Sequence, residues 1–412
     1  MSEAYNVLIV GGGPAGLTAA EAAASKGARV VVLERQNEIG YPIHTSGGSW
    51  ISDMKVLSVP EHLYHPIHNV VFVSPDREVS FHYDTALACV VDIRGLYQYL
   101  ATRAIAAGAE IRVRHTVDQV LSEGERIVGV TYKNHVSARS SLYADVVIDA
   151  SGFSRHVGVR TEMGSAFHRY GFGAEYDLYA PAYPQDTVYL IMGSIYAPQG
   201  YAWAFPRGNG RVRLGVGVIH PDSDEDARPY LNNVWNMPQL KEKLKGASPI
   251  EYHTGLFPAE RPVERFSRSG LLLAGDAGSH GSTLVGEGIR FAMYSGQMAG
   301  AVAGDAIKAG DNSAEFLSRF DRQWRARFGR DMEISYLVNK HIAAFSDEQW
   351  NGALDMLKRL TPAQVAQALH CDYSAGLFMG MIARNPRLLR SGGKRFLELL
   401  LERIQRPATA NA

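Results

Sequence analysis

Three glycines near the N-terminus have the spacing that lets a phosphate group approach the backbone. Gly11, Gly13 and Gly16 stand between an apolar run, residues 6–10, and an alanine-rich segment, residues 14–26. In a strand–turn–helix unit the first glycine permits the tight turn, the second leaves room for a pyrophosphate, and the third lets the helix pack closely on the strand. Amides at the start of the helix favour negative charge. The pattern predicts a dinucleotide-binding turn.

An acidic residue stands where such a nucleotide would carry its ribose. Apart from Arg29, residues 28–33 are apolar and include three β-branched valines, as expected of a second buried strand, and Glu34 and Arg35 follow directly. A carboxylate at that strand end can accept hydrogen bonds from ribose hydroxyls. A glycine-rich turn without a ligand is the alternative for the triplet alone. The order of strand, helix, strand and acid favours the nucleotide.

A second candidate corner lies far along the chain. Gly275 and Asp276 follow the apolar run 271–274, and Gly286 and Gly288 precede an expected helix. The aspartate could hold a sugar or ribityl hydroxyl, and the helix N-terminus could stabilise negative charge on a flavin. Taken alone, the aspartate could instead be a helix N-cap. Two such corners indicate one long ligand across the sheet, which favours FAD over NAD.

Two weaker candidates complete the set. Asp149 and Gly152 follow the apolar strand 145–148, where a plain polar turn is the alternative. Arg94 opens an expected helix over residues 94–107 and could meet an FAD phosphate or ribityl oxygen, although a surface arginine explains it nearly as well.

Together these elements resemble the FAD-dependent oxidoreductases of the para-hydroxybenzoate hydroxylase-like group, and within it the geranylgeranyl reductase family. The discriminating stretch is Tyr201-Ala-Trp203-Ala-Phe205-Pro206, followed by Gly215-Val-Gly217. It is similar to that family's Y-x-W-x-F-P…G-x-G signature, and the resemblance extends over nearly the whole chain. The FAD elements, by contrast, are common to many flavoenzymes.

The resemblance implies an FAD-dependent reductase that saturates carbon–carbon double bonds of an isoprenoid, geranylgeranyl-like or similarly apolar substrate. The residues expected at FAD are Gly11, Gly13, Pro14, Ala15, Gly16, Glu34, Arg35, Thr45, Ser46, Gly47, Arg94, Asp149, Gly152, Gly275, Asp276, Gly286, Gly288 and Ile289. Tyr201, Trp203 and Phe205 alternate on one strand, so they project from one face. They would form an apolar wall for the substrate, unless the strand is simply packed into the core.

One departure from the family concerns the loop after the second strand. Many members carry Cys-x-x-Gly after an Ile-Gly-x-Pro turn, whereas here Ile39-Gly-Tyr-Pro42 leads to His44 and Thr45. Thr45 therefore stands where the thiol would be. His44, Thr45 and Tyr201 are the catalytic candidates, and a surface role is the alternative for His44.

Other functions stay open. A flavin monooxygenase acting on an aromatic or polyketide-like compound would share the FAD scaffold, and so would a flavin-carrying electron-transfer or binding protein. A second G-x-G-x-x-G motif is not evident in the sequence, so the external reductant could be NADPH or a ferredoxin-type donor.

These motifs require an α/β fold. We expect a Rossmann-like, glutathione-reductase-like parallel sheet that binds FAD, an antiparallel substrate-binding sheet, and a helical C-terminal cap. The FAD-binding domain is expected in residues 1–60, 90–160 and 265–312, the substrate domain in 61–89 and 161–264, and the helical domain in 313–406. Residues 41–60 predict a loop. The runs 111–113, 117–121 and 128–132 predict a small meander.

Composition limits the partners. Lys and Arg total 42 against 42 Asp and Glu, and this neutral balance argues against a nucleic-acid ligand. Two cysteines, Cys89 and Cys371, fit a reduced cytoplasmic compartment and provide no thiolate metal site on their own. We expect no metal, no targeting segment and no membrane-spanning helix.

The C-terminal tail has a separate composition. From residue 376 onward it holds apolar residues and two acidic residues, Glu398 and Glu402. Its basic residues are Arg384, Arg387, Arg390, Lys394, Arg395, Arg403 and Arg406. A basic amphipathic helix could lie on an anionic membrane surface. Packing of the tail on the enzyme, with its arginines in water, is the alternative.

Overall fold

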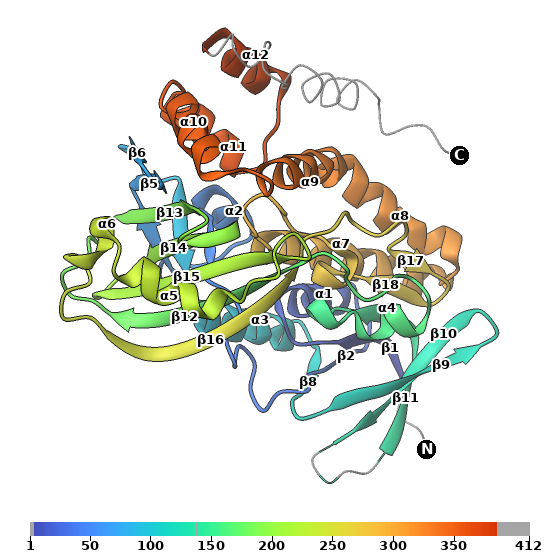
Figure 1. The fold of residues 1–412 in the computed structure, drawn as a ribbon. Coiled ribbons are helices and arrows are strands. Elements are labelled where there is room, and N and C mark those ends of the chain that lie inside the picture. Colours follow the sequence, from blue (N-terminus) through green and yellow to red (C-terminus); the bar gives the residue numbers. More distant parts are fainter. Residues whose placement is uncertain (1–3, 135, 137–138, 385–412) are drawn as a thin grey trace.

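Two large sheets and a series of C-terminal helices make up the fold (Figure 1). The computed structural model describes residues 4–134, 136 and 139–384. In the first sheet the strands run in the order β17 (Ser267–Arg268), β18 (Leu271–Leu273), β11 (Arg139–Asp149), β1 (Ala4–Val10), β2 (Val30–Leu33) and β8 (Glu110–Arg112). From β18 to β8 all pairings are parallel, so the carboxyl ends of these strands meet at one edge.

The predicted meander was wrong in its first strand. β9 (Thr116–Glu123) and β10 (Arg126–Lys133) pair antiparallel, and β10 continues onto β11. β8 instead pairs with β2 and extends the parallel sheet. A run as short as residues 111–113 carries no information about its pairing partner, which explains the error.

Helices and the meander cover opposite faces of this sheet. α1 (Pro14–Ala24), α3 (Ile93–Ala106) and α7 (Ile289–Ala309) bury one face, whose inward residues include Val7, Ile9 and Val32. The other face, with Leu8 and Val31, packs on side chains of β9, β10 and β11. The short α4 (His156–Arg160) follows β11.

The second sheet is almost entirely antiparallel. Its order is β16 (Ser248–Pro258), β12 (Tyr170–Tyr179), β15 (Arg211–His220), β14 (Ala197–Pro206), β13 (Thr187–Gly193), β5 (Asn69–Ser74) and β6 (Arg77–His82). Among the described strands of this second sheet, only β13 and β5 pair in parallel. α5 (Ala227–Trp235) and α6 (Pro238–Lys241) cover one face of this sheet. The other face carries Tyr201 and Trp203 and borders a cavity.

The segment predicted as a loop, residues 41–60, holds regular structure. β3 (Gly48–Trp50) pairs with β7 (Ala88–Val91), which also pairs with β4 (Tyr64–Ile67). α2 (Ile51–Val56) follows β3. β3 and α2 are too short to leave a periodic pattern in the sequence. The prolines and glycines of this segment therefore led to the prediction of a loop.

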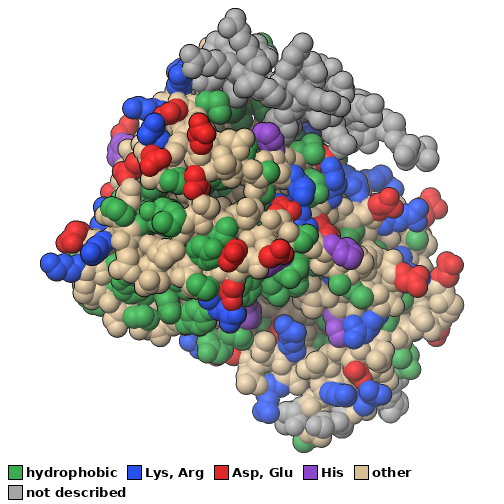
Figure 2. Space-filling model, in the orientation of Figure 1, with side chains coloured by type: hydrophobic (Ala, Val, Ile, Leu, Met, Phe, Trp, Pro, Cys, Tyr) green, Lys and Arg blue, Asp and Glu red, His purple; other side chains and the backbone are tan. Residues whose placement is uncertain are grey.

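Helices form the C-terminal part of the described chain, as predicted. α8 (Ala314–Trp324), α9 (Arg330–Ile342), α10 (Asp347–Leu357), α11 (Pro362–Leu369) and α12 (Ala375–Arg384) run along the top of the molecule in Figure 1. The basic tail beyond Arg384 lies outside the described residues. Within residues 4–384 as described, no helix has the length and apolar character needed to cross a bilayer. Basic and acidic side chains are interspersed on the face in Figure 2.

Glycines bring α7 onto α1. A methyl group on Gly296 would lie 2.2 Å from the carbonyl oxygen of Ala15, and one on Gly300 would lie 2.2 Å from that of Ala19. Such contacts involve backbone, which cannot move aside without separating the helices. α1 starts at the first candidate corner and α7 at the second, so the close packing of these two helices fixes the two corners relative to each other.

Gly300→Ala should lower the stability of the protein by about 1–3 kcal/mol, because the added methyl group forces the two helices apart. Thermal unfolding midpoints would measure this change. Gly352→Ala is the matched control, because Gly352 is exposed within α10 and an added methyl group meets no described atom within 4 Å. The control should gain about 0.5–1 kcal/mol from helix propensity. Equal midpoints for the two variants would contradict the packing argument.

Candidate active site

A cavity of about 1010 Å³ extends from the carboxyl ends of the parallel strands, along the face of the second sheet, to helices α9–α11. His44, Tyr201 and Trp203 line it. Most residues predicted at the cofactor line it too: Gly11, Gly13, Pro14, Ala15, Glu34, Arg35, Thr45, Ser46, Gly152, Gly275, Asp276, Gly286, Gly288 and Ile289. Segments hundreds of residues apart thus meet in one space.

The first corner has the form of a phosphate cradle. α1 starts directly after Gly13, and no side chain of the described residues caps it, so its first amides are left for a ligand. A methyl group on Gly13 would meet no described atom within 4 Å, so the backbone there is open to the cavity. Gly16 lies beneath, where a methyl group would stand 2.0 Å from the Gly11 carbonyl oxygen. These features fit a pyrophosphate.

Glu34 closes the side of this cradle. It follows β2, and its carboxylate accepts hydrogen bonds of 2.7 Å from the amides of Gly12 and Gln36. A carboxylate has lone pairs beyond these two bonds, and the side chain lines the cavity. The geometry fits a ribose whose hydroxyls donate to Glu34.

The second corner repeats the arrangement. α7 starts after Gly288, again without a capping side chain among the described residues, and its N-terminus opens on the same cavity. Burial raises the pKa of the Asp276 carboxyl to about 6. A buried carboxylate without a cation is costly unless hydroxyl groups donate to it. The corner fits the polar end of a flavin, with its ribityl hydroxyls at Asp276.

The structure does not bring Asp149 to the cavity. Its side chain is fully buried and accepts hydrogen bonds from Ser151 and from the amides of Val157 and Gly158, at 2.5–3.0 Å. These bonds hold the turn after β11 and the start of α4, and Gly152 in that turn does line the cavity. Asp149 therefore does not contact the cavity, but it fixes the conformation of the turn that forms part of the cavity wall.

Arg94 and Gly47 also lie outside the cavity lining. Arg94 is half-exposed and forms an ion pair with Glu38, which itself lines the cavity. Gly47 is buried with φ +84°, and a methyl group there would meet Ile93 and Arg213 within 3 Å. Gly47 thus serves the packing of its loop.

The predicted aromatic strand is β14, and its residues divide between two roles. Tyr201 and Trp203 line the cavity, whereas Phe205 packs beneath Gly48 and does not. The Tyr201 hydroxyl donates a 2.5 Å hydrogen bond to the Val285 carbonyl, and burial raises its pKa. Two of the three therefore form the wall, and the third supports the first residue of β3.

The glycine pair of the signature seats the indole. Trp203 pairs across the strands with Gly215, and Tyr201 with Gly217. A methyl group on Gly215 would stand 2.3 Å from the Trp203 ring, so the indole lies flat over β15. In that position its Nε1 donates to the Glu175 carboxylate on the next strand, β12. Tyr201 and Trp203 of β14 are thus spaced so that each lies opposite a glycine of β15, which leaves room for the Trp203 ring.

The loop with His44, Thr45 and Ser46 lies against the second sheet. A methyl group on Gly255 would be 2.0 Å from the His44 carbonyl oxygen, and buried Arg213 donates a 2.6 Å hydrogen bond to the Ser46 carbonyl. The His44 ring is exposed, with Nδ1 2.9 Å from the Thr254 carbonyl oxygen. Thr45, between these anchors, faces the cavity.

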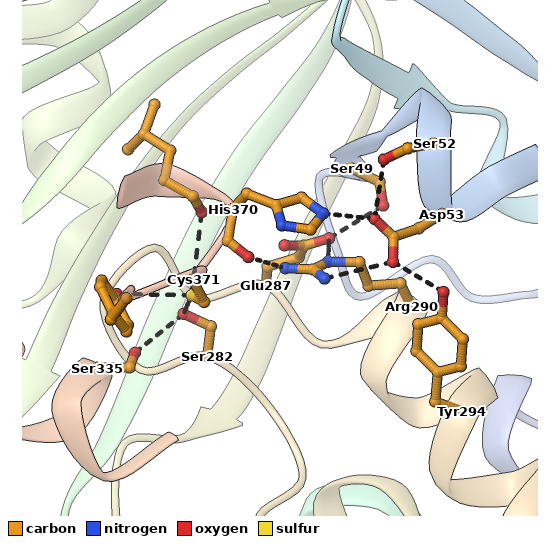
Figure 3. Close-up of polar contacts among 12 residues, drawn as sticks. Ser49, Ser52, Asp53, Ser282, Glu287, Arg290, Tyr294, Ser335, His370 and Cys371 are labelled. Carbon is orange, nitrogen blue, oxygen red and sulfur yellow. Dashed lines mark hydrogen bonds and ion pairs between the residues drawn. The ribbon is translucent and has the colours of Figure 1, made fainter. Parts of the chain in front are cut away.

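A buried cluster ties the C-terminal helices to this site (Figure 3). Arg290 of α7 lies between Glu287, at 2.8 Å, and Asp53 of α2, at 3.5 Å, and donates a 2.6 Å bond to the His370 carbonyl. Burial opposes ionisation of Asp53. The hydrogen bond from His370, with Arg290 and Tyr294, nevertheless lowers its pKa to about 2. Burial raises the pKa of Glu287.

Sequence reasoning missed several cavity residues. Glu175 and His253 lie on neighbouring strands, and Trp350, Leu354 and Leu357 come from α10. Polar Glu175 and Asp177 alternate with apolar residues along β12, so the sequence predicts a strand there. Only the pairing register of the sheet places Glu175 beside Trp203. Nothing in the sequence connects α10 to the second sheet.

Two glycine-rich strand ends and two uncapped helix N-termini along one cavity are the arrangement of an FAD-dependent oxidoreductase. The model of the FAD dependent oxidoreductase family matches residues 6–169, and that of the geranylgeranyl reductase catalytic domain matches residues 171–256. The digeranylgeranylglycerophospholipid reductase 2 of Methanopyrus kandleri is 30% identical over 395 residues, covering 94% of this chain and 98% of the relative.

Other comparisons agree. The digeranylgeranylglycerophospholipid reductase of Methanosarcina acetivorans is 30% identical over 381 residues, covering 87% of this chain and 90% of that protein. A solved geranylgeranyl bacteriochlorophyll reductase-like protein from Thermoplasma acidophilum superposes with a TM-score of 0.85 at 24% identity, covering 97% of this chain and all of that one. This chain belongs to the geranylgeranyl reductase family of FAD-dependent oxidoreductases.

Asp276→Asn should stabilise the apoprotein at pH 8 and weaken FAD binding. The folded protein raises the pKa of Asp276 from its ordinary value to about 6, so the penalty for the buried charge grows between about pH 4 and 6 and is complete above. Removing the charge should gain about 1–2 kcal/mol. Thermal unfolding of the apoprotein and FAD titration would measure both effects. A stability gain that persists unchanged below pH 4 would contradict the cause given.

Gly215→Ala should displace the Trp203 indole and break its bond to Glu175, at a cost of about 1–3 kcal/mol. Tryptophan emission, compared with Trp203→Phe in each background, would report the ring's surroundings. Gly173→Ala is the control, because its methyl group would lie 3.5 Å from the same ring, an ordinary contact. The idea fails if both glycine variants keep the wild-type emission.

Proposed function

We propose that this protein uses FAD to reduce carbon–carbon double bonds in the prenyl chains of a lipid. Family membership supports the reaction class. The names of the two relatives given above indicate that those proteins act on digeranylgeranylglycerophospholipids. The single observation that carries the substrate class is the shape of the cavity. Its polar end fits a flavin, and it continues into an apolar arm.

The apolar arm is built by two distant parts of the chain. Phe72, Leu190 and Met192 come from the second sheet, and Trp350 and Leu354 come from α10. α10 packs on β5, β6 and β13, so it closes the arm along its length. Apolar walls on both sides can shield a methyl-branched prenyl chain from water, and they offer no partner for a strongly polar ligand.

The chain's residues would bind and orient the two ligands. Amides at the start of α1 hold the pyrophosphate, Glu34 and Asp276 accept from sugar and ribityl hydroxyls, and Tyr201 and Trp203 form the wall beside the reacting bond. When bound and reduced, FAD supplies the hydride. The electrons come from an external donor, NADPH or a ferredoxin-type protein. The basic tail would hold the enzyme at the lipid surface.

Anaerobic reoxidation tests the proposal. Protein loaded with FAD and reduced with dithionite should be reoxidised by a geranylgeranyl lipid without oxygen, and mass spectrometry should show products heavier by about 2 Da for each bond reduced. Leu354→Trp, which fills the apolar arm, should slow this reoxidation by about tenfold or more, with FAD content unchanged. Reoxidation that requires oxygen and yields a hydroxylated product would instead identify a monooxygenase.

A further inference from the structure

An asparagine lies where the polar end of the cavity meets its apolar arm. Asn339 belongs to α9 and lines the cavity together with Ile342, one turn further along the helix. One turn earlier, Ser335 accepts a 2.9 Å hydrogen bond from the Leu284 amide and contacts Ser282, in the loop that precedes the second corner (Figure 3). After α9 the chain continues into α10, which forms one wall of the arm. Asn339 therefore lies between the second corner and the arm.

A buried arginine fixes the side chain of Asn339. Arg169, just before β12, donates a 2.6 Å hydrogen bond from Nη2 to the Asn339 Oδ1. Its other nitrogens donate to the Asp222 carboxylate at 2.8 Å and to the Ala259 carbonyl at 2.6 Å, so the guanidinium is held on three sides. A guanidinium only donates, so the oxygen of the amide must face Arg169 and the NH2 group must point away from it.

The amide nitrogen of Asn339 is left free for a ligand. The residue is 5% exposed and lines the cavity, and its Nδ2 has no acceptor within hydrogen-bond distance in the part of the chain that the structure describes. Nδ2 nevertheless keeps some accessible surface, so it opens on the cavity and is not sealed in packed protein. When a lipid displaces water from this space, the donor stays unsatisfied unless the lipid supplies an acceptor.

The choice of an amide at this position adds to the argument. An aspartate has the same shape and would accept from Arg169 through a stronger, charge-assisted hydrogen bond. Holding Arg169, and with it α9, would therefore need only a carboxylate. What the amide adds is a donor on the cavity side. A hydrocarbon has no acceptor for that donor, so the matching ligand group is an oxygen.

We propose that Asn339 recognises the lipid by donating a hydrogen bond to the oxygen that joins the prenyl chain to its head group. This inference rests on the proposed function and names the part of the substrate that distinguishes a lipid from a bare hydrocarbon. Arg169 is a positioning residue, because it fixes the amide. The flavin is less suited as the acceptor. Its polar groups are provided for by Asp276 and the start of α7, and Asn339 lies one helical turn nearer to the arm than the loop between them.

The test is a double-mutant cycle between the residue and the ligand. Geranylgeranyl methyl ether, and the hydrocarbon with the same carbon chain and no oxygen, are titrated into oxidised holoenzyme in one detergent, and calorimetry gives both dissociation constants. Relative to the hydrocarbon, the ether should lose about tenfold in affinity in Asn339→Asp, which turns the donor into an acceptor, and in Asn339→Leu, which removes it.

Asn232→Asp is the matched control. Asn232 is exposed on α5 and also accepts a hydrogen bond through its Oδ1, so this variant adds the same charge away from the cavity. It should keep the wild-type ratio of the two dissociation constants. FAD content and thermal midpoint should stay close to wild type in Asn339→Asp, because its carboxylate still accepts from Arg169.

A purely structural asparagine would give a different pattern. Asn339→Asp preserves the bond to Arg169, so an unchanged ratio in that variant overturns the proposal. A fixed ratio with a FAD dissociation constant raised by about tenfold also overturns it, because the donor then serves the flavin. If wild type binds the ether with the expected preference but never reduces it anaerobically, the proposed function fails while the recognition by Asn339 stands. Absence of binding of either ligand to wild type overturns both.

Discussion

Everything at the polar end of the cavity depends on three strands that end in register. Val10 of β1 pairs with Asp149 of β11, and Asp149 pairs with Leu273 of β18. Parallel pairing requires their carboxyl ends to lie side by side, so the turns that follow each strand meet. The cradle after β1 and the acid after β18 thus stand on opposite sides of one turn, whose shape Asp149 fixes by hydrogen bonds to Val157 and Gly158.

Most of the fold could be read from the sequence because its main strands and helices are long and repetitive. The runs 7–10 and 30–33 are apolar throughout, and Gly11 marks the end of the first. Short elements were different. β8 joined the parallel sheet, and β3 and α2 lay within an expected loop, because three to six residues carry too little periodicity to fix a type or a partner.

The cofactor corners could be predicted better than the chemistry beside them. The spacing of glycines depends on the local backbone conformation, which the sequence alone can indicate. Gly13 and Gly288 were therefore predicted at the cofactor site, and both line the cavity. Glu175 and His253 are far apart in the chain, and only strand register joins them. Family likeness drew attention to Phe205, whose side chain turned out to support Gly48. A motif identifies residues that matter without saying whether they touch a ligand.

Neither sheet is made from one continuous stretch of chain, and this affects how the protein can be synthesised. β1 lies in the middle of its sheet, yet its neighbour β11 begins some 130 residues later and β18, which pairs with β11, some 260 residues later; β5 awaits β13 across more than a hundred residues. On the ribosome, β1 can pair with β2 and β5 with β6, but the other edge of β1 and of β5 must remain unpaired until the later strands emerge. Such edges invite aggregation, so we expect nascent chains of this protein to rely on chaperones more than their final stability would indicate.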